Sequence, residues 1–252
     1  GWRSAHPIPD DYTRDGVFDV LHDTNLVRVR EIAETDTGKI GTLYKIAMNT
    51  EKLNADGVRP VAAQIAEIDA IKSRDELPEF IGRMHQMTSA FWGDGVALDE
   101  TDSTHYLYNI GQGGLGLARD YYFDTDKKTI QIRKKYLEFI AKQMKNFGIS
   151  VDAKKLYDLE LRMARSFYPK EKLRDPHANY HKMTLDEIKS RFPGFDWDAY
   201  LAARGATRAT QINIAQPEAI AESIAIMNDT DLDLIKTYLK YRIVSSADTL
   251  LD

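Results

Sequence analysis

The sequence predicts a mainly α-helical, multi-helix domain that carries a small β-hairpin. Apolar residues recur at intervals of three and four along most of the 252-residue chain, which is the spacing of amphipathic helices. Two short alternating runs near the middle break this pattern and flank a polar turn, as the strands of a hairpin do. Because a two-stranded hairpin is only marginally stable alone, we expect it to pack on the helices.

Four helices are expected in the N-terminal half, at residues 17–32, 38–47, 60–71 and 78–87. Thr37 is the expected cap of the second, because a hydroxyl there can accept a free amide of the first turn. Pro60 and Pro78 suit the first turns of the third and fourth, where the amide that proline lacks would have no helical partner.

The hairpin strands are expected at residues 96–99 and 105–110, around the polar turn of residues 100–103. Residues 211–214, Gln-Ile-Asn-Ile, also alternate and predict an isolated strand.

Six further helices are expected after the hairpin, at residues 132–147, 156–167, 185–191, 197–203, 217–227 and 232–251. Gly148 and Gly205 stand where a left-handed residue ends a helix. Thr184 and Glu187 have the spacing of a capping box, in which each side chain binds a free backbone amide of the other. Thr230 is the expected cap of the last helix.

Composition excludes several classes of function. The chain has 34 Lys and Arg against 39 Asp and Glu, a formal net charge of −5 with mixed signs, which is not the electrostatic pattern of a nucleic-acid or anionic-membrane binder. It contains no cysteine, which excludes disulfides, thiolate metal sites and a cysteine nucleophile. No apolar run approaches the roughly 20 residues that span a bilayer.

Both ends are expected to be cut from a longer protein. The chain begins at Gly1 rather than at a methionine, and its last apolar stripe stops at Asp252 without a residue that ends a helix. The absence of a signal peptide therefore says little about the parent protein.

A glycine-rich segment follows the second strand. Residues 111–116, Gly-Gln-Gly-Gly-Leu-Gly, match the pattern that lets a backbone approach a dinucleotide pyrophosphate. That function needs a helix opening within the motif and a second parallel strand, and the sequence predicts neither. A glycine-rich turn that leaves the hairpin is the favoured interpretation.

Two histidines have the spacing of zinc ligands on one helical face. His177 and His181 are four residues apart, but Ala178 stands where a zinc peptidase needs its glutamate. Pro176 precedes them, so the segment is expected to be a connecting loop. No serine-nucleophile or phosphate-loop motif occurs either, so we predict no catalytic and no metal-binding residue in this chain.

Arg14 and Asp19 are the charges of most interest near the first helix. A guanidinium can hold a peptide's terminal carboxylate in a two-bond fork, and an aspartate one turn away could orient it. From the residues alone, a surface ion pair is the competing interpretation.

Five blocks of sequence carry a family resemblance, and they occur in the family's order over nearly the whole chain. They lie at residues 1–21 (with Gly-Trp, Pro-Ile-Pro and Arg-Asp-Gly-Val-Phe-Asp-Val-Leu), 115–122 (Leu-Gly-Leu, Arg-Asp-Tyr-Tyr), 175–185, 195–197 and 239–246. The chain thereby resembles the N-terminal helical region of the neprilysin and endothelin-converting-enzyme family of zinc metalloendopeptidases. In having no cysteines, the chain resembles the bacterial oligopeptidase members of the family rather than the animal members.

The resemblance implies a fragment of a larger two-domain peptidase. The family's zinc motifs lie C-terminal to the matched region, so zinc is expected in the full-length protein and no cofactor in this chain. Residues 1–25 would form a strip that joins the missing catalytic domain. Residues 26–252 would form the helical capping domain, incomplete at its C-terminus, that limits entry to the active-site chamber.

The resemblance also implies a substrate-binding role for Arg14 and Asp19. The matching arginine of the family contacts the free carboxylate of bound peptides, and the aspartate supports it. His22 stands where the family has a second arginine, which would make this recognition pH-dependent if the imidazole titrates nearby.

The leading hypothesis is therefore the non-catalytic, substrate-access portion of a peptidase that hydrolyses oligopeptides. Its partners would be short peptides and the missing C-terminal catalytic domain, and the isolated chain would be inactive. The alternative is a stand-alone helical module that binds peptides or a protein without chemistry. The family implies a periplasmic, envelope-associated or secreted protein, with the cytoplasm as the other option.

Overall fold

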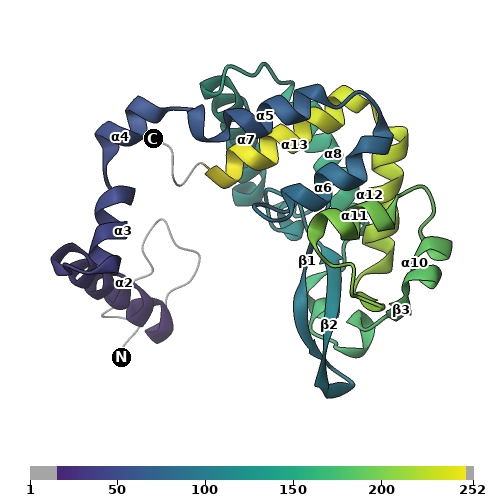
Figure 1. Ribbon diagram of the computed structural model, residues 1–252. Helices are drawn as coiled ribbons and strands as arrows, with labels where there is room; N and C mark the ends of the chain where they lie inside the picture. Colours follow the sequence, from purple (N-terminus) through teal and green to yellow (C-terminus); the bar gives the residue numbers. More distant parts are fainter. Residues whose placement is uncertain (1–15, 248–252) are drawn as a thin grey trace. The chain divides into compact units, whose positions relative to one another are not determined.

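The chain divides into two compact units. The computed structural model describes residues 16–247. Within these residues, one unit comprises residues 16–57 and the other comprises residues 58–247. The assignment of residues 1–25 to a strip that joins a catalytic domain stays a prediction. Figure 1 labels most of the helices and strands of both units.

The described part of the first unit consists of helices α2 (Val17–Thr35), α3 (Lys39–Ala47) and α4 (Thr50–Asp56). The carboxylate of Asp36 accepts hydrogen bonds from the amides of Gly38 and Gly41, at 2.9 and 2.8 Å. The predicted cap at Thr37 is therefore wrong, because the turn after α2 brings the neighbouring aspartate onto the free amides of α3.

This unit buries almost nothing of its own. Among its described residues only Ala33 and Gly41 are buried. Large apolar side chains of α2 and α3 are exposed instead, by between 41 and 86% of their surface. They are Val17, Phe18, Val20, Leu21, Leu26, Val27, Val29, Ile32, Ile40, Leu43 and Ile46. Helices of this length draw most of their stability from packing, so this apolar face needs a covering surface.

The second unit contains the remaining helices and the sheet. Its α-helices are α5 (Arg59–Ala70), α6 (Leu77–Met84), α7 (Lys127–Asn146), α8 (Ala153–Ser166), α9 (Lys170–Leu173), α10 (Leu185–Arg191), α11 (Trp197–Arg204), α12 (Pro217–Asp229) and α13 (Leu232–Ala247). Short 3-10 helices cover Arg74–Glu76, Arg119–Tyr122 and His177–Asn179. Within residues 16–247, no helix has the length and apolar composition to cross a membrane.

Local signals placed most helix ends correctly. The capping box of Thr184 and Glu187 is present, and Gly205 ends α11 with a φ of +77°. The predicted cap at Thr230 is wrong, because the Asp231 carboxylate accepts from the amides of Asp233 and Leu234 at 3.0 and 3.2 Å.

The hairpin prediction is confirmed, and it extends into a four-stranded sheet of order β1-β2-β4-β3. β1 (Trp92–Asp99) pairs antiparallel with β2 (Asp102–Gln112), whose residues 108–110 pair in parallel with β4 (Gln211–Ile214). β3 (Lys182–Thr184) pairs antiparallel with β4. Residues 211–214 are thus a strand as predicted, but not an isolated one. In Figure 1 the far end of the β1–β2 hairpin extends beyond the helices of this unit.

A cluster of aromatic rings fixes the start of the hairpin against α11. Trp92, Trp197 and Tyr200 are each at most 1% exposed, and the two indoles stack with ring centres 5.9 Å apart. The indole of Trp92 also donates to the hydroxyl of Tyr200 at 3.0 Å. Aromatic contacts of this kind add stability beyond simple burial, so β1 and α11 form one rigid support.

Candidate functional site

The predicted carboxylate-binding residues lie at the start of α2. Asp19 is half-buried in its first turn, where a negative charge is favourable, and His22 is exposed one turn later. Residues three apart share a helical face, so these two side chains lie on one side of α2. Arg14 falls outside the described residues, and the substrate-binding role of the three stays a prediction.

The histidine pair is not arranged as two zinc ligands on one helix. His177 begins the 3-10 helix and is exposed, whereas His181 follows it beside β3. The Nδ1 atom of His181 is buried and has no hydrogen-bond partner in the described part of the chain. Within residues 16–247, no three His, Asp or Glu side chains are grouped closely enough to hold a metal ion.

The glycine-rich segment packs against the core instead of opening a helix. A Cβ atom on Gly113 would lie 2.7 Å from the amide of Gly93, and one on Gly116 would lie 1.8 Å from the hydroxyl of Tyr136. Gly114 has a φ of +88°. These glycines are needed for close backbone approach within the fold, which confirms the turn and gives no support to nucleotide binding.

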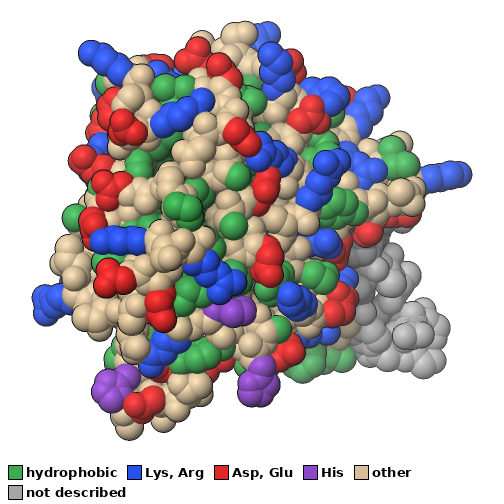
Figure 2. Space-filling view, turned by 90° about the vertical axis from the view of Figure 1, so that its right-hand side faces the viewer, with side chains coloured by type: hydrophobic (Ala, Val, Ile, Leu, Met, Phe, Trp, Pro, Cys, Tyr) green, Lys and Arg blue, Asp and Glu red, His purple; other side chains and the backbone are tan. Residues whose placement is uncertain are grey.

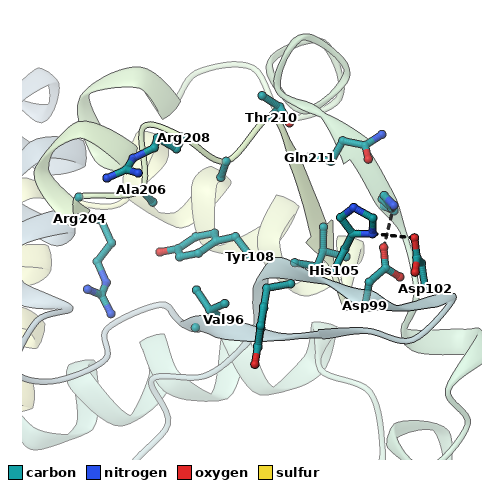
Figure 3. A pocket seen from close by; sticks show the side chains of 16 residues that line it. Val96, Asp99, Asp102, His105, Tyr108, Arg204, Ala206, Arg208, Thr210 and Gln211 are labelled. Carbon is teal, nitrogen blue, oxygen red and sulfur yellow. Dashed lines mark hydrogen bonds and ion pairs between the residues drawn. The ribbon is translucent and has the colours of Figure 1, made fainter.

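A groove of about 710 Å³ lies between the far half of the hairpin and the segment that follows α11. Figure 3 shows Arg204 and Arg208 at one end, and Asp99, Asp102 and His105 at the other. Gly205 ends α11 in the left-handed conformation, so the chain turns sharply there and both arginines line the same groove.

A buried carboxylate holds Arg204 in place. Asp94 on β1 is 3% exposed, and Arg204 donates to it from Nε at 2.7 Å. Asp94 also accepts from the hydroxyl of Tyr108 and lies 3.0 Å from Nδ1 of His85. Burial opposes ionisation, but the hydrogen bonds from His85 and Tyr108 and the nearby positive charges outweigh it and lower the pKa of Asp94.

Hydrogen bonds and an ion pair hold the acidic side chains at the hairpin tip. The ammonium of Lys182 donates to Asp99 at 2.7 Å, and Tyr180 and Thr101 donate to the same carboxylate. The bond from Lys182 and the others hold the pKa of Asp99 well below its ordinary value. The carboxylate of Asp102 lies 2.7 Å from Nδ1 of His105.

One edge of β2 is open beside the groove. The carbonyl of Ile110 accepts from the amide of Ala215 on the β4 side of the strand. Backbone groups alternate sides along a regular strand, so Tyr108 and Tyr106 direct their amides and carbonyls toward that same side. β4 pairs only with residues 108–110, so no described strand covers the edge beyond Tyr108.

A second buried carboxyl lies in the helical core. Glu160 is 0% exposed and accepts from the amide of Gly116 at 3.1 Å and from the hydroxyls of Tyr122 and Tyr136 at 2.8 and 2.7 Å. Burial raises its pKa to about 7, although these hydroxyls stabilise the anion. The Glu160 carboxyl joins α8 to α7 and to the segment after β2, so its contacts stabilise the fold.

The surface charge is mixed. On the face shown in Figure 2, acidic and basic side chains alternate without forming a large patch of one sign. This agrees with the formal net charge of −5 and does not favour a nucleic-acid partner.

Comparison with known proteins finds relatives of this chain. A family model of the N-terminal part described as "Peptidase family M13" matches residues 1–252. The chain is 25% identical to endothelin-converting enzyme 1 of Rattus norvegicus over 279 aligned residues, covering all of the chain and 36% of that protein. It is 27% identical to membrane metallo-endopeptidase-like 1 of Homo sapiens, covering 80% of the chain and 30% of that protein.

Solved structures agree with these sequence matches. The zinc metalloprotease ZMP1 of Mycobacterium tuberculosis, in complex with an inhibitor, superposes with a TM-score of 0.86 at 25% identity, covering 99% of this chain and 41% of that one. PEPO from Lactobacillus rhamnosis HN001 gives a TM-score of 0.71 at 14% identity, which shows the shared fold alone. The chain thus spans well under half the length of the proteins it matches.

Proposed function

The chain belongs to peptidase family M13, whose N-terminal region it matches over residues 1–252, and on that premise we propose that it forms the non-catalytic, substrate-access portion of a zinc metalloendopeptidase. The enzyme would hydrolyse oligopeptides. The observation that carries this proposal is the match of the whole chain to the family's N-terminal part and to about a third of the length of endothelin-converting enzyme 1. The sequence contains no H-E-x-x-H motif.

The described residues do not fit a zinc site. They bring together no group of three or more His, Asp or Glu side chains, whereas a catalytic zinc takes three protein ligands. On the family assignment, metal and water activation would come from a part of the protein outside this chain. The present residues would shape the chamber and bind the peptide.

The apolar face of α2 and α3 supports a second part of the protein as partner. Phe18, Ile40 and Leu43 are 86, 62 and 69% exposed in a unit with almost no core. Many exposed large apolar side chains in one small unit favour an interface with another part of the protein. We propose that the missing catalytic domain covers it.

Peptide ends would be held at the start of α2. The guanidinium of Arg14 would bind the terminal carboxylate of a peptide in a two-bond fork, and Asp19 would orient Arg14. His22, exposed on the same side of α2 as Asp19, would add a second donor when its imidazole is protonated.

The purified chain tests the non-catalytic assignment. It should leave oligopeptides uncleaved with or without added zinc. Cleavage that a chelator abolishes and zinc restores would overturn the assignment. A chain that binds peptides while the native protein has no catalytic part would favour the stand-alone binding module instead.

A further inference from the structure

We propose that the groove between the β1–β2 hairpin and the segment after α11 binds an extended peptide segment that carries an acidic side chain. Oligopeptides are the substrates of the proposed enzyme, so the biological use of the groove rests on the proposed function. The binding itself does not, because it needs only residues of this chain.

The open edge of β2 offers the backbone contacts. Tyr106 directs its amide and carbonyl toward the side on which β4 stops pairing at Tyr108. An extended peptide laid along this edge would add a strand, and its main-chain hydrogen bonds would supply affinity without regard to sequence. Proteins normally shield such an edge, and here the groove leaves it accessible.

Exposed apolar side chains of the hairpin offer the contacts for alternate residues of the peptide. Val96, Leu98 and Tyr106 are 66, 52 and 74% exposed. Leu98 lies opposite Tyr106 in the strand register, and Val96 opposite Tyr108, so all four share one face of the hairpin. An extended chain presents every second side chain to one face, which matches this spacing.

The charges select an acidic residue. Arg204 uses Nε for the buried Asp94, and no contact of its two terminal nitrogens is seen among the described residues. Arg208 is exposed at the same end of the groove and has no ion-pair partner within residues 16–247. The acids that line the groove, Asp99 and Asp102, are at the other end and are paired with Lys182 and His105.

A carboxylate entering at the arginine end would therefore find open donors. Guanidinium–carboxylate bonds are among the stronger hydrogen bonds in proteins, and their fork geometry gives specificity. The fixed position of Arg204 reduces the entropy lost on binding, because its side chain is already held by Asp94.

Fluorescence anisotropy on the whole chain tests the proposal. The probe is an eight-residue peptide of alternating Val and Thr with one central Glu, labelled with fluorescein and amidated at its C-terminus. The amide removes the terminal carboxylate, so a clamp at the start of α2 cannot hold this probe. We expect the same peptide with Gln in place of Glu to bind about tenfold more weakly.

Two variants locate the binding. Arg208→Ala should weaken the Glu peptide by about tenfold and reduce the preference for Glu over Gln, with Arg204 as the remaining donor. Arg165→Ala on α8 is the matched control, since it deletes an equally exposed guanidinium outside the groove. Methylating alternate backbone amides of the peptide should also abolish binding if the peptide adds a strand.

Several results would overturn the proposal. Equal affinities for the Glu and Gln peptides, or equal effects of Arg208→Ala and Arg165→Ala, would each remove the acidic-peptide site. Stronger binding of a Gln peptide with a free C-terminus would show that chain ends, not acidic side chains, are recognised. The assay needs neither zinc nor cleavage, so its failure is distinguishable from failure of the proposed peptidase function.

Discussion

Arg204 at the end of α11 donates from Nε to the carboxylate of Asp94 on β1, at 2.7 Å, across 110 residues of sequence. The side chain of Asp94 is 3% exposed, whereas that of Arg204 is 27% exposed and lines the groove. This ion pair joins the hairpin to the segment that forms the opposite wall. The two walls of the groove are therefore held together by the ion pair between Asp94 of β1 and Arg204 of α11.

Asp94→Asn should destabilise the chain by about 3 kcal/mol, because it leaves Arg204 without its buried anion and weakens the bonds from His85 and Tyr108. Urea unfolding measures the loss. The control is Asp158→Asn on α8. The side chain of Asp158 pairs with Lys154 and is 48% exposed, so this ion pair should contribute at most about 1 kcal/mol. Equal losses for the two variants would show that the buried Asp94 stabilises the fold no more than an exposed ion pair does.

Glu160 should make the stability of the chain fall as pH rises. Its folded-state pKa of about 7 lies above the ordinary 4.5, so the folded state holds the proton more tightly than the unfolded state. The resulting stabilisation is present in full below pH 4.5 and is lost as pH rises through about 7; its size is on the order of 3 kcal/mol.

Urea midpoints of the wild type and Glu160→Gln between pH 4.5 and 8 test this sign. The difference between the two should grow in favour of the variant as pH rises, because a glutamine cannot ionise. The exposed Glu138→Gln on α7 is the control and should run parallel to the wild type. Parallel curves for Glu160→Gln would contradict the raised pKa.

Arg14→Ala in the complete enzyme should weaken peptides with a free C-terminus by about tenfold or more in kcat/KM. Amidated versions of the same peptides should be nearly unaffected, because the lost guanidinium contacts only the terminal carboxylate. Steady-state kinetics with the paired peptides gives both values. Equal losses for free and amidated peptides would remove the carboxylate-binding role of Arg14.

Substitutions of the exposed apolar residues of α2 and α3 should lower the stability of the protein only when the covering domain is present. Phe18→Ser and Ile40→Ser remove side chains that are 86 and 62% exposed, so each should change the stability of the isolated chain by less than about 0.5 kcal/mol. In the complete protein each should cost about 1.5–3 kcal/mol, because the side chain would be buried there.

Thermal unfolding of both forms measures these changes, with the exposed Lys45→Ser on α3 as control. If Phe18→Ser and Ile40→Ser leave the complete protein as stable as Lys45→Ser does, another part of the protein does not cover this face.

Features fixed by neighbouring residues were predictable from the sequence. The capping box of Thr184 and Glu187 and the glycine end of α11 depend on side chains within a few positions of one another, so their spacing reveals them. The caps at Thr37 and Thr230 were missed by one residue. In both cases a neighbouring aspartate binds two amides, and hydroxyl and carboxylate caps look alike in sequence.

Long-range pairing was not predictable from local pattern. β4 joins β2 in parallel through Tyr108 and Ile212, about a hundred residues apart, and β3 is too short to show alternation. Asp94, Arg204 and Arg208 likewise gave no signal, because the groove forms only when the hairpin and the end of α11 meet. The residues proposed for peptide ends, in contrast, came from the family resemblance.

The intact mass and peptide map of the native protein in its source cells, measured by mass spectrometry, test whether this chain is part of a larger peptidase. We expect a protein more than twice the 28.7 kDa of this chain, continuing past Asp252 into a peptide with the H-E-x-x-H motif. Native material that ends near Asp252 would contradict the peptidase assignment and leave a non-catalytic binding protein.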